Sequence, residues 1–313
     1  MFPVLFILLA LVILTLVSGG YIFLVGCVRR KELPWLVEEE IKKTSYGKYY
    51  PYMVLSDRWL REHDAQDVYT TSEDGLRLHG LWIPAEDPKG TILLAHGYRS
   101  TKLCDFGMAY PYYHELGINI LVPDQRSHGE SEGRFITFGV KESRDMVCWI
   151  NFHNERFGPC QMILSGMSMG ASTMLYLADA SLPDNVKGII ADCGFTSAKE
   201  ILSSVFKRIV HLPAAPSLWA ADLFARLFAG FSLCEKDTRK SLANAKLPVF
   251  LVHGTGDDFV PYEMTQQAFD ACRSEKKLLL VEGAEHGVSF IKDQQTYTCM
   301  ILDFLKNNLE GFS

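Results

Sequence analysis

Beyond residue 67, short apolar segments alternate with longer segments of helical periodicity. The apolar segments span 91–95, 118–123, 161–165, 187–192, 248–253 and 277–282, and several are nearly continuous runs of Ile, Leu and Val. Such runs are typical of strands buried on both faces of a parallel sheet. Helical patterns lie near 102–116, 139–157, 169–180, 262–273 and 290–309, and 68–71 and 76–84 flank a hairpin turn. This alternation predicts an α/β fold with a mostly parallel sheet and helices on both faces.

One interval interrupts the alternation. Between 197 and 246 there is no convincing strand, and 201–231 has a helical pattern broken by Pro213 and Pro216. Its aromatic residues are Phe206, Trp219, Phe224, Phe228 and Phe231. An insertion of this length exceeds what a crossover requires, which favours a helical cap over a site at the carboxyl edge of the sheet. The alternative is an ordinary crossover with one extra surface helix.

The first 28 residues contain no charged side chain and are almost wholly apolar. As a helix they would extend about 40 Å, more than the hydrocarbon core of a bilayer, which is about 30 Å thick. A transmembrane helix over 1–28 is therefore predicted in preference to a buried helix of a soluble protein. A cleaved signal peptide is disfavoured, because no Lys or Arg precedes the apolar stretch.

Three bases, Arg29, Arg30 and Lys31, directly follow the apolar stretch. By the positive-inside rule they place the following domain in the cytoplasm, as part of a single-pass membrane protein. The cysteines after Cys27 show no pairing pattern, which agrees with a reducing compartment. The alternative is a lipid anchor, because residues 24–27 resemble a bacterial lipobox that would attach lipid to Cys27 on the outer side of the membrane.

Residues 29–66 are predicted to form a juxtamembrane connector. Trp35, Tyr46, Tyr49, Tyr50 and Tyr52 are interspersed here with Lys42, Lys43 and Lys48. Aromatic and basic side chains together suit the interface between lipid and water. A strap that packs on the catalytic domain explains the same composition equally well.

Composition excludes several functional classes. Acidic residues outnumber basic ones by 37 to 31, which argues against a nucleic-acid partner. The 8 cysteines are scattered, and no metalloprotease, dinucleotide-binding or P-loop motif occurs. Neither a metal nor an organic cofactor is therefore expected.

The sequence GMSMG at 166–170 places a serine between a predicted strand and a predicted helix. This is the context of a nucleophile elbow, in which a tight turn raises the serine hydroxyl above the sheet. Glycine at both ends of the motif removes side chains that would collide with the strand and the helix. Ser168 is therefore the predicted nucleophile, and the nearby Ser165 and Ser172 are interpreted as structural.

A serine hydroxyl needs a general base, and that base needs an orienting acid. Of the 9 histidines, His286 stands between the last predicted strand and the last helix, at the same sheet edge as Ser168. Asp257 and Asp258 follow the strand before it, and Asp192 ends a third strand. Chemistry alone leaves the choice among these acids open.

A developing oxyanion requires preorganised N–H donors. One is expected from Met169, the residue after the nucleophile. The second is expected from Tyr98, which follows Gly97 on the loop after the strand at 91–95. Glycine at that position permits close approach of the backbone.

From about residue 67 to 313 the chain resembles the α/β-hydrolase superfamily, most of all a serine-hydrolase branch of bacterial membrane-anchored hydrolases and esterases related to prolyl oligopeptidase. The motifs that carry the resemblance are HGY at 96–98, DQRSHGES at 124–131, GMSMG at 166–170, HGTGDDFVP at 253–261 and AEHG at 284–287. The chain order Ser168, acid, His286 matches the family. The family's pattern HGxxDxxVP implies Asp257 as the acid rather than Asp258. The resemblance also implies that DQRSHGES braces the loop near the site.

Together these features predict a serine hydrolase that cleaves carboxylic esters through an acyl-enzyme intermediate, with 67–313 as its catalytic domain. The aromatic, apolar cap and the membrane helix favour a hydrophobic acyl group on a small-molecule or lipid-like ester. The alternatives are an acyl thioesterase, a serine peptidase of the prolyl-oligopeptidase type and a non-catalytic membrane-tethered binding module. The last would require a broken triad, and no triad position departs from the family pattern.

Overall fold

The computed structural model describes residues 2–31, 37–43, 47–211 and 213–312. Its centre is a sheet of eight strands, β1 (Gln66–Thr71), β2 (Arg77–Ile83), β3 (Gly90–Ala95), β4 (Ile118–Pro123), β5 (Met162–Met167), β6 (Val186–Asp192), β7 (Val249–Gly254) and β8 (Lys276–Val281). Their spatial order is β1-β2-β4-β3-β5-β6-β7-β8. β1 and β2 form the predicted hairpin and β2 is antiparallel to β4, whereas the other pairs are parallel. The predicted mostly parallel sheet is confirmed.

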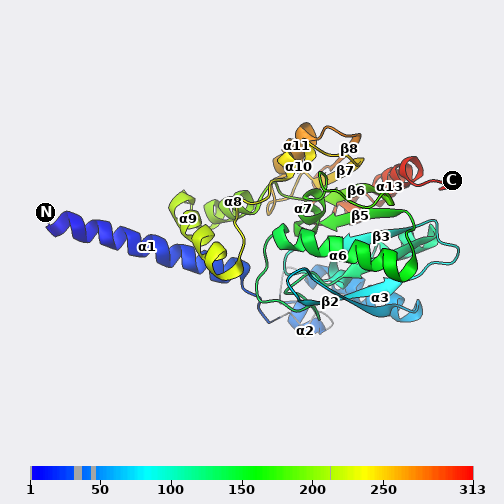
Figure 1. Ribbon diagram of the computed structural model, residues 1–313, viewed down its shortest axis with the longest axis horizontal. Coiled ribbons are helices and arrows are strands. Elements are labelled where there is room, and N and C mark those ends of the chain that lie inside the picture. The colour runs from blue at the N-terminus through cyan, green and yellow to red at the C-terminus, as the bar shows by residue number, and fades with distance from the viewer. Residues whose placement is uncertain (1, 32–36, 44–46, 212, 313) are drawn as a thin grey trace.

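Helices cover both faces of this sheet, as the continuous apolar strands require (Figure 1). One face carries α4 (Lys102–Phe106), α5 (Tyr110–Glu115) and α13 (Gln294–Asn308), whose Phe106, Tyr110 and Phe304 belong to one buried core. The other face carries α6 (Val140–Phe157), α7 (Met169–Leu175), α10 (Thr238–Leu242) and α11 (Tyr262–Ala271), with Trp149 and Met174 in a second core. Every residue of β3, β4 and β7 is buried between these layers.

Two predicted helices are each divided in two. The segment 102–116 forms α4 and α5, because Pro111 lacks an N–H and is placed in the first turn of a new helix. The segment 290–309 corresponds to α12 (Ser289–Lys292) and α13. Asp293 ends α12, and its side chain accepts a hydrogen bond from the Thr296 amide at the start of α13.

The interval between β6 and β7 contains α8 (Ala198–Val210), α9 (Ala215–Phe224), the π-helix η2 (Ala225–Ala229) and α10. No strand occurs among its described residues. A third core joins these helices to residues that follow the carboxyl ends of strands, including Met169, Phe195 and Val260. The helices therefore lie where the cap was predicted, beside the edge of the sheet that carries the site.

The N-terminal helix α1 (Phe2–Cys27) projects from the domain with α9 beside its final part (Figure 1). Its stretch Pro3–Cys27 is long and apolar enough to cross a membrane, with a mean hydropathy of 2.5. A signal sequence near the N-terminus can pass the same test of length and composition. The end of α1 is joined to the fold, because the amide of Ile136 donates to the carbonyl of Cys27 at 2.7 Å. The next residue, Val28, forms a β-bridge with Phe135.

The connector folds into α2 (Glu38–Ile41), the short η1 (Gly47–Tyr49) and α3 (Tyr50–Glu62). α3 buries Met53 and Leu60, and Leu60 joins the core on the face of α4 and α5. This part of the connector therefore packs on the domain as a strap. Trp35 and Tyr46, two of the predicted interfacial aromatics, lie outside the described residues.

Candidate active site

Ser168 stands on the turn between β5 and α7. Its backbone φ is +54°, a left-handed value that is strained for a residue with a Cβ. The flanking glycines permit this turn. A Cβ on Gly166 would lie 2.2 Å from the carbonyl oxygen of Gly170, and one on Gly170 would lie 1.8 Å from that of Ala95. The turn therefore has the form that the GMSMG motif predicts.

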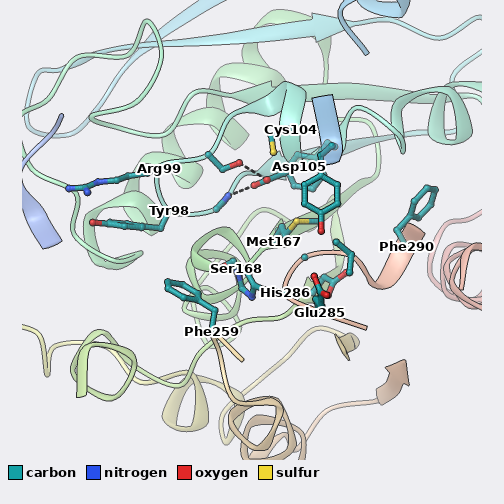
Figure 2. A pocket seen from close by; sticks show the side chains of 18 of the residues that line it. Tyr98, Arg99, Cys104, Asp105, Met167, Ser168, Phe259, Glu285, His286 and Phe290 are labelled. Carbon is teal, nitrogen blue, oxygen red and sulfur yellow. Dashed lines mark hydrogen bonds between the residues drawn. The ribbon is translucent and has the colours of Figure 1, made fainter. Parts of the chain in front are cut away.

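His286 lies on the loop between β8 and α12, close to Ser168 (Figure 2). Its Nε2 is 3.0 Å from the Ser168 hydroxyl oxygen, and its Nδ1 is 2.6 Å from Oδ2 of Asp257. An ionised carboxylate only accepts hydrogen bonds, so Nδ1–H donates to Asp257 and Nε2 accepts from the Ser168 hydroxyl. The structure thus brings together three predicted residues from three separate loops.

The Asp257 carboxylate is held by several donors. Its Oδ1 accepts from the amides of Phe259 and Val260 at 2.9 and 2.8 Å, and its Oδ2 lies 3.1 Å from Nε2 of His253. Burial favours the neutral acid, but the hydrogen bonds with His253 and His286 outweigh it and hold the pKa of Asp257 below its ordinary value. Asp257 is therefore charged at neutral pH.

Neither of the other two candidate acids is hydrogen-bonded to His286. The side chain of Asp258 is 92% exposed and lies 3.9 Å from Arg208. Asp192 is buried, where it accepts hydrogen bonds from the hydroxyls of Tyr297 at 3.0 Å and Ser289 at 3.4 Å. Burial raises the pKa of Asp192. Of the three acids that the sequence offered as candidates, Asp257 is the one hydrogen-bonded to the imidazole of His286.

The loop at 96–98 approaches the nucleophile closely, since a Cβ on Gly97 would lie 3.3 Å from the Cβ of Ser168. Met169 is the first residue of α7, so its amide has no acceptor within that helix. The Met169 peptide therefore directly follows Ser168, and the loop that carries Tyr98 lies beside it.

The peptide of Tyr98 is fixed by its two neighbours. The amide of Gly97 donates to Oδ2 of Asp105 at 2.6 Å, and the amide of Arg99 donates to Nε2 of His128 at 3.0 Å. These two bonds orient the backbone on either side of the Tyr98 amide. Preorganisation of this kind is what an oxyanion donor requires.

Asp105 is a site residue that sequence reasoning missed. It also accepts a hydrogen bond from the Ser100 hydroxyl at 2.5 Å, so it ties together both ends of the turn (Figure 2). Burial raises the pKa of Asp105. No motif includes Asp105. In the sequence it is only one acidic residue in a predicted helix, shortly after HGY.

The side chains of Tyr98 and Arg99 point away from Ser168 (Figure 2). The Tyr98 hydroxyl donates to the carbonyl of Gly26 at 2.9 Å. The Arg99 guanidinium donates to the carbonyls of Val25 at 2.6 Å and Val28 at 3.2 Å. A cation at these carbonyls is favourable because a helix C-terminus carries partial negative charge. The same short loop therefore binds the end of α1 and presents its backbone to the site.

The DQRSHGES segment braces this loop, as the resemblance implied. The amide of Gln125 donates to Nε2 of His96 at 3.0 Å, and Nε2 of His128 accepts from the Arg99 amide. Asp124 is paired with Lys102 at 2.7 Å and with His79 at 2.7 Å. These contacts hold the segment next to the loop at 96–99, which it supports.

Ser168 and His286 open into a cavity of about 1050 Å³. Its apolar lining includes Met108, Tyr113, Ile136, Met167, Phe259, Val288, Phe290 and Ile291. Its basic lining residues include Arg30 and Lys31, just after α1, and Arg208 of α8. The cavity is therefore lined by apolar residues together with charged ones, two of which closely follow α1.

Within the described residues, one group of side chains has donors close enough for a metal ion. It comprises Cys193, Asp257 and His286, whose donor atoms lie within 4.8 Å of one another. Burial raises the pKa of the Cys193 thiol, and Nδ1 of His286 is already engaged with Asp257. Thiol protonation and this hydrogen bond both compete with metal ligation.

The fold and the site define an enzyme of the α/β-hydrolase superfamily, of the serine hydrolase class. A model of the prolyl oligopeptidase family matches residues 108–312. The chain belongs to the prolyl oligopeptidase family, and the relationship that its motifs suggested is confirmed.

Similar proteins agree with this placement. The uncharacterized protein YqkD of Bacillus subtilis is 30% identical over 234 residues, 74% of this chain and 76% of the relative. Protein bem46 of Schizosaccharomyces pombe is 24% identical over 237 residues, 73% and 72% of the two chains. The Pyrococcus furiosus esterase Pf2001 has a TM-score of 0.65 at 21% identity, with 79% of this chain and 92% of the esterase covered. At that identity the structural likeness shows the fold alone.

Proposed function

We propose that this protein is a membrane-bound serine esterase that cleaves carboxylic esters with a hydrophobic acyl group. The observation that carries the proposal is the unbroken hydrogen-bonded chain from Ser168 through His286 to Asp257 at the cavity wall. A nucleophile, its base and an orienting acid in that succession form the arrangement used in acyl transfer.

In the first half-reaction the Ser168 oxygen attacks the substrate's carbonyl carbon while its proton moves to Nε2 of His286. The carbonyl oxygen becomes an oxyanion that the amides of Tyr98 and Met169 stabilise. His286, held as a cation by Asp257, then gives that proton to the departing alkoxide, and the acyl group remains on Ser168. A water molecule deprotonated by the same nitrogen attacks the acyl carbon, releases the acid and restores the serine.

The size and lining of the cavity support a hydrophobic acyl group. Its volume of about 1050 Å³ is at the upper end for small-molecule sites, and apolar side chains such as Met167, Phe259 and Phe290 line it. An extended acyl chain is the kind of ligand that fills such a space without needing many polar partners.

Packing of α1 supports its retention as a membrane anchor. Phe23 and Cys27 are buried against the domain, and the side chains of Tyr98 and Arg99 bind the last carbonyls of α1. Removal of α1 as a leader, or processing at a lipidated Cys27, would leave these side chains without their acceptors. The bases after α1 keep the cytoplasmic orientation as our expectation.

A peptidase is the second candidate, because the matched family is named for prolyl oligopeptidase. The Pyrococcus horikoshii acylaminoacyl peptidase also shares the fold, with a TM-score of 0.59 at 18% identity. This chain covers only 42% of that peptidase but 92% of the esterase Pf2001. The difference in coverage makes the esterase our first choice.

A substrate panel on the full-length protein in detergent micelles tests the proposal. It contains p-nitrophenyl esters of increasing acyl length, an acyl-CoA and a peptide p-nitroanilide. We expect the highest kcat/KM with the longer esters and loss of turnover in Ser168→Ala. Preferred cleavage of the acyl-CoA or of the anilide would replace the esterase by a thioesterase or a peptidase. If no substrate is turned over and Ser168 is unreactive, the protein is a binding module and not an esterase.

A further inference from the structure

Large apolar side chains are exposed on the cap. Ile209, Trp219, Leu227 and Phe228 are between 62% and 69% exposed, and the exposed Val210 ends α8. We call these five residues the cap patch. Single exposed apolar residues are ordinary, but a group of this size on adjoining helices marks a surface that meets an apolar partner.

The contacts of α9 place its part of the cap patch beside α1. The hydroxyl oxygens of Ser217 and Ser18 lie 2.8 Å apart. The two helices approach so closely that a Cβ on Gly19 would lie 2.4 Å from the Cβ of Ala220. Close crossings lined by Gly, Ala and Ser are typical of helix pairs in membranes.

This crossing lies well inside the apolar span of α1. Gly19 precedes Cys27, the last residue of α1, by about 12 Å of helix, and the first charged residue, Arg29, stands two residues further on. The crossing therefore lies near the middle of a hydrocarbon core about 30 Å thick. Nearer the charged end, the rings of Phe23 and Phe228 are 6.1 Å apart. α9 lies beside α1, away from the central sheet (Figure 1). A membrane that accommodates α1 in this arrangement would therefore also surround the outer faces of α9 and of η2, which continues it.

The charges on this part of the cap are paired. The Asp222 carboxylate accepts hydrogen bonds from Arg226 at 2.8 Å, from the Ser232 hydroxyl at 2.8 Å and from the Leu233 amide at 2.6 Å. A carboxylate with three donors is less costly to place beside lipid than an isolated charge. Arg226 is long enough to extend its guanidinium towards the headgroups.

We propose that the cap patch is a membrane-binding surface whose partner is the acyl-chain region of one bilayer leaflet. This inference rests on the proposed membrane attachment through α1 and extends it to the cap. The cavity agrees with this placement, because Arg208 lines it immediately before Ile209 and Arg30 lines it just after α1. An ester dissolved in that leaflet therefore reaches Ser168 from the lipid.

Trp219 provides a direct test. Full-length protein is reconstituted in phosphatidylcholine vesicles, with or without bromine on the acyl chains, and Trp219→Phe is measured in parallel. The difference between the two proteins is the emission of Trp219, since the other four tryptophans contribute to both. We expect brominated lipid to remove at least half of this difference and aqueous acrylamide to leave most of it. Quenching by acrylamide but not by brominated lipid would overturn the proposal.

A second probe separates this inference from the attachment of α1. Leu9→Trp is introduced in the Trp219→Phe background, and the difference in emission between this double variant and Trp219→Phe reports on α1 alone. If that probe is quenched by brominated lipid while Trp219 is not, α1 is in the membrane and the cap inference is wrong. If neither is quenched, the proposed attachment fails, and the cap inference fails with it.

A charge in the patch tests the route of the substrate. Leu227→Glu should lower turnover of a long-chain ester incorporated in vesicles at least fivefold while leaving turnover of a short water-soluble ester unchanged. Leu55→Glu is the matched control, because Leu55 is exposed on α3, outside the cap. Equal losses in both variants would contradict a role of the cap patch in access from the lipid.

Discussion

The carboxylate of Asp257 lies 2.6 Å from Nδ1 of His286 and determines which ring nitrogen carries the proton. Asparagine at this position removes the charge and permits the other tautomer, in which Nε2 cannot accept the Ser168 proton. We therefore expect Asp257→Asn to lower kcat by about 10⁴-fold with little change in KM. Steady-state kinetics with a p-nitrophenyl ester measure both constants.

Asp258→Asn is the control for this prediction. It makes the same chemical change one residue away, at a side chain that faces Arg208 and solvent. Its kcat should fall only slightly. Comparable losses in the two variants would show that the acid has been assigned to the wrong residue.

Asp105 positions the oxyanion loop through the Gly97 amide and the Ser100 hydroxyl. An asparagine retains a single acceptor oxygen, so Asp105→Asn releases one of these donors. Losing one oxyanion donor costs about 10²-fold or more in kcat, and we expect a loss of that order with KM nearly unchanged. Kinetics together with circular dichroism check the prediction. A folded variant with normal kcat would mean that Asp105 is only structural.

Stability should depend on pH through His128. Burial, with a smaller effect of His96, lowers the pKa of His128 to about 3. In the unfolded chain this ring takes up a proton below about pH 6.5, so the folded state binds fewer protons between about pH 6.5 and 3. Stability then falls as pH drops through that window, by up to about 1.4 kcal/mol per pH unit.

His128→Gln tests this dependence because glutamine offers an acceptor to the Arg99 amide but does not titrate. Denaturant unfolding in detergent micelles should show a shallower loss of stability with acid in the variant than in the parent. Parallel pH dependences would indicate that His128 takes up its proton within the folded protein.

The sequence predicted those parts of the fold whose evidence lies within a short stretch of residues. The buried strands are continuous apolar runs, and Ser168 lies in a motif whose two glycines are required by backbone contacts at Gly170 and Ala95. The division of 102–116 ahead of Pro111 also had a signal in the sequence, but the apolar pattern continued across the break between Phe106 and Tyr110.

Other parts of the site depend on contacts between distant segments. Asp257 and Asp258 have the same chemistry, so residue types alone did not choose between them, and the choice came from the family pattern. The bonds from Tyr98 and Arg99 to the end of α1 join residues more than seventy positions apart. Such pairs follow from the packing of complete elements, which no short sequence window contains.

The most direct test of the central assignment is covalent labelling of the full-length protein with a fluorophosphonate, followed by peptide mapping in a mass spectrometer. We predict a single adduct, on Ser168, that is absent in Ser168→Ala and still forms in Ser172→Ala. An adduct on a different residue, or undiminished labelling of Ser168→Ala, would contradict the assignment of Ser168 as the nucleophile.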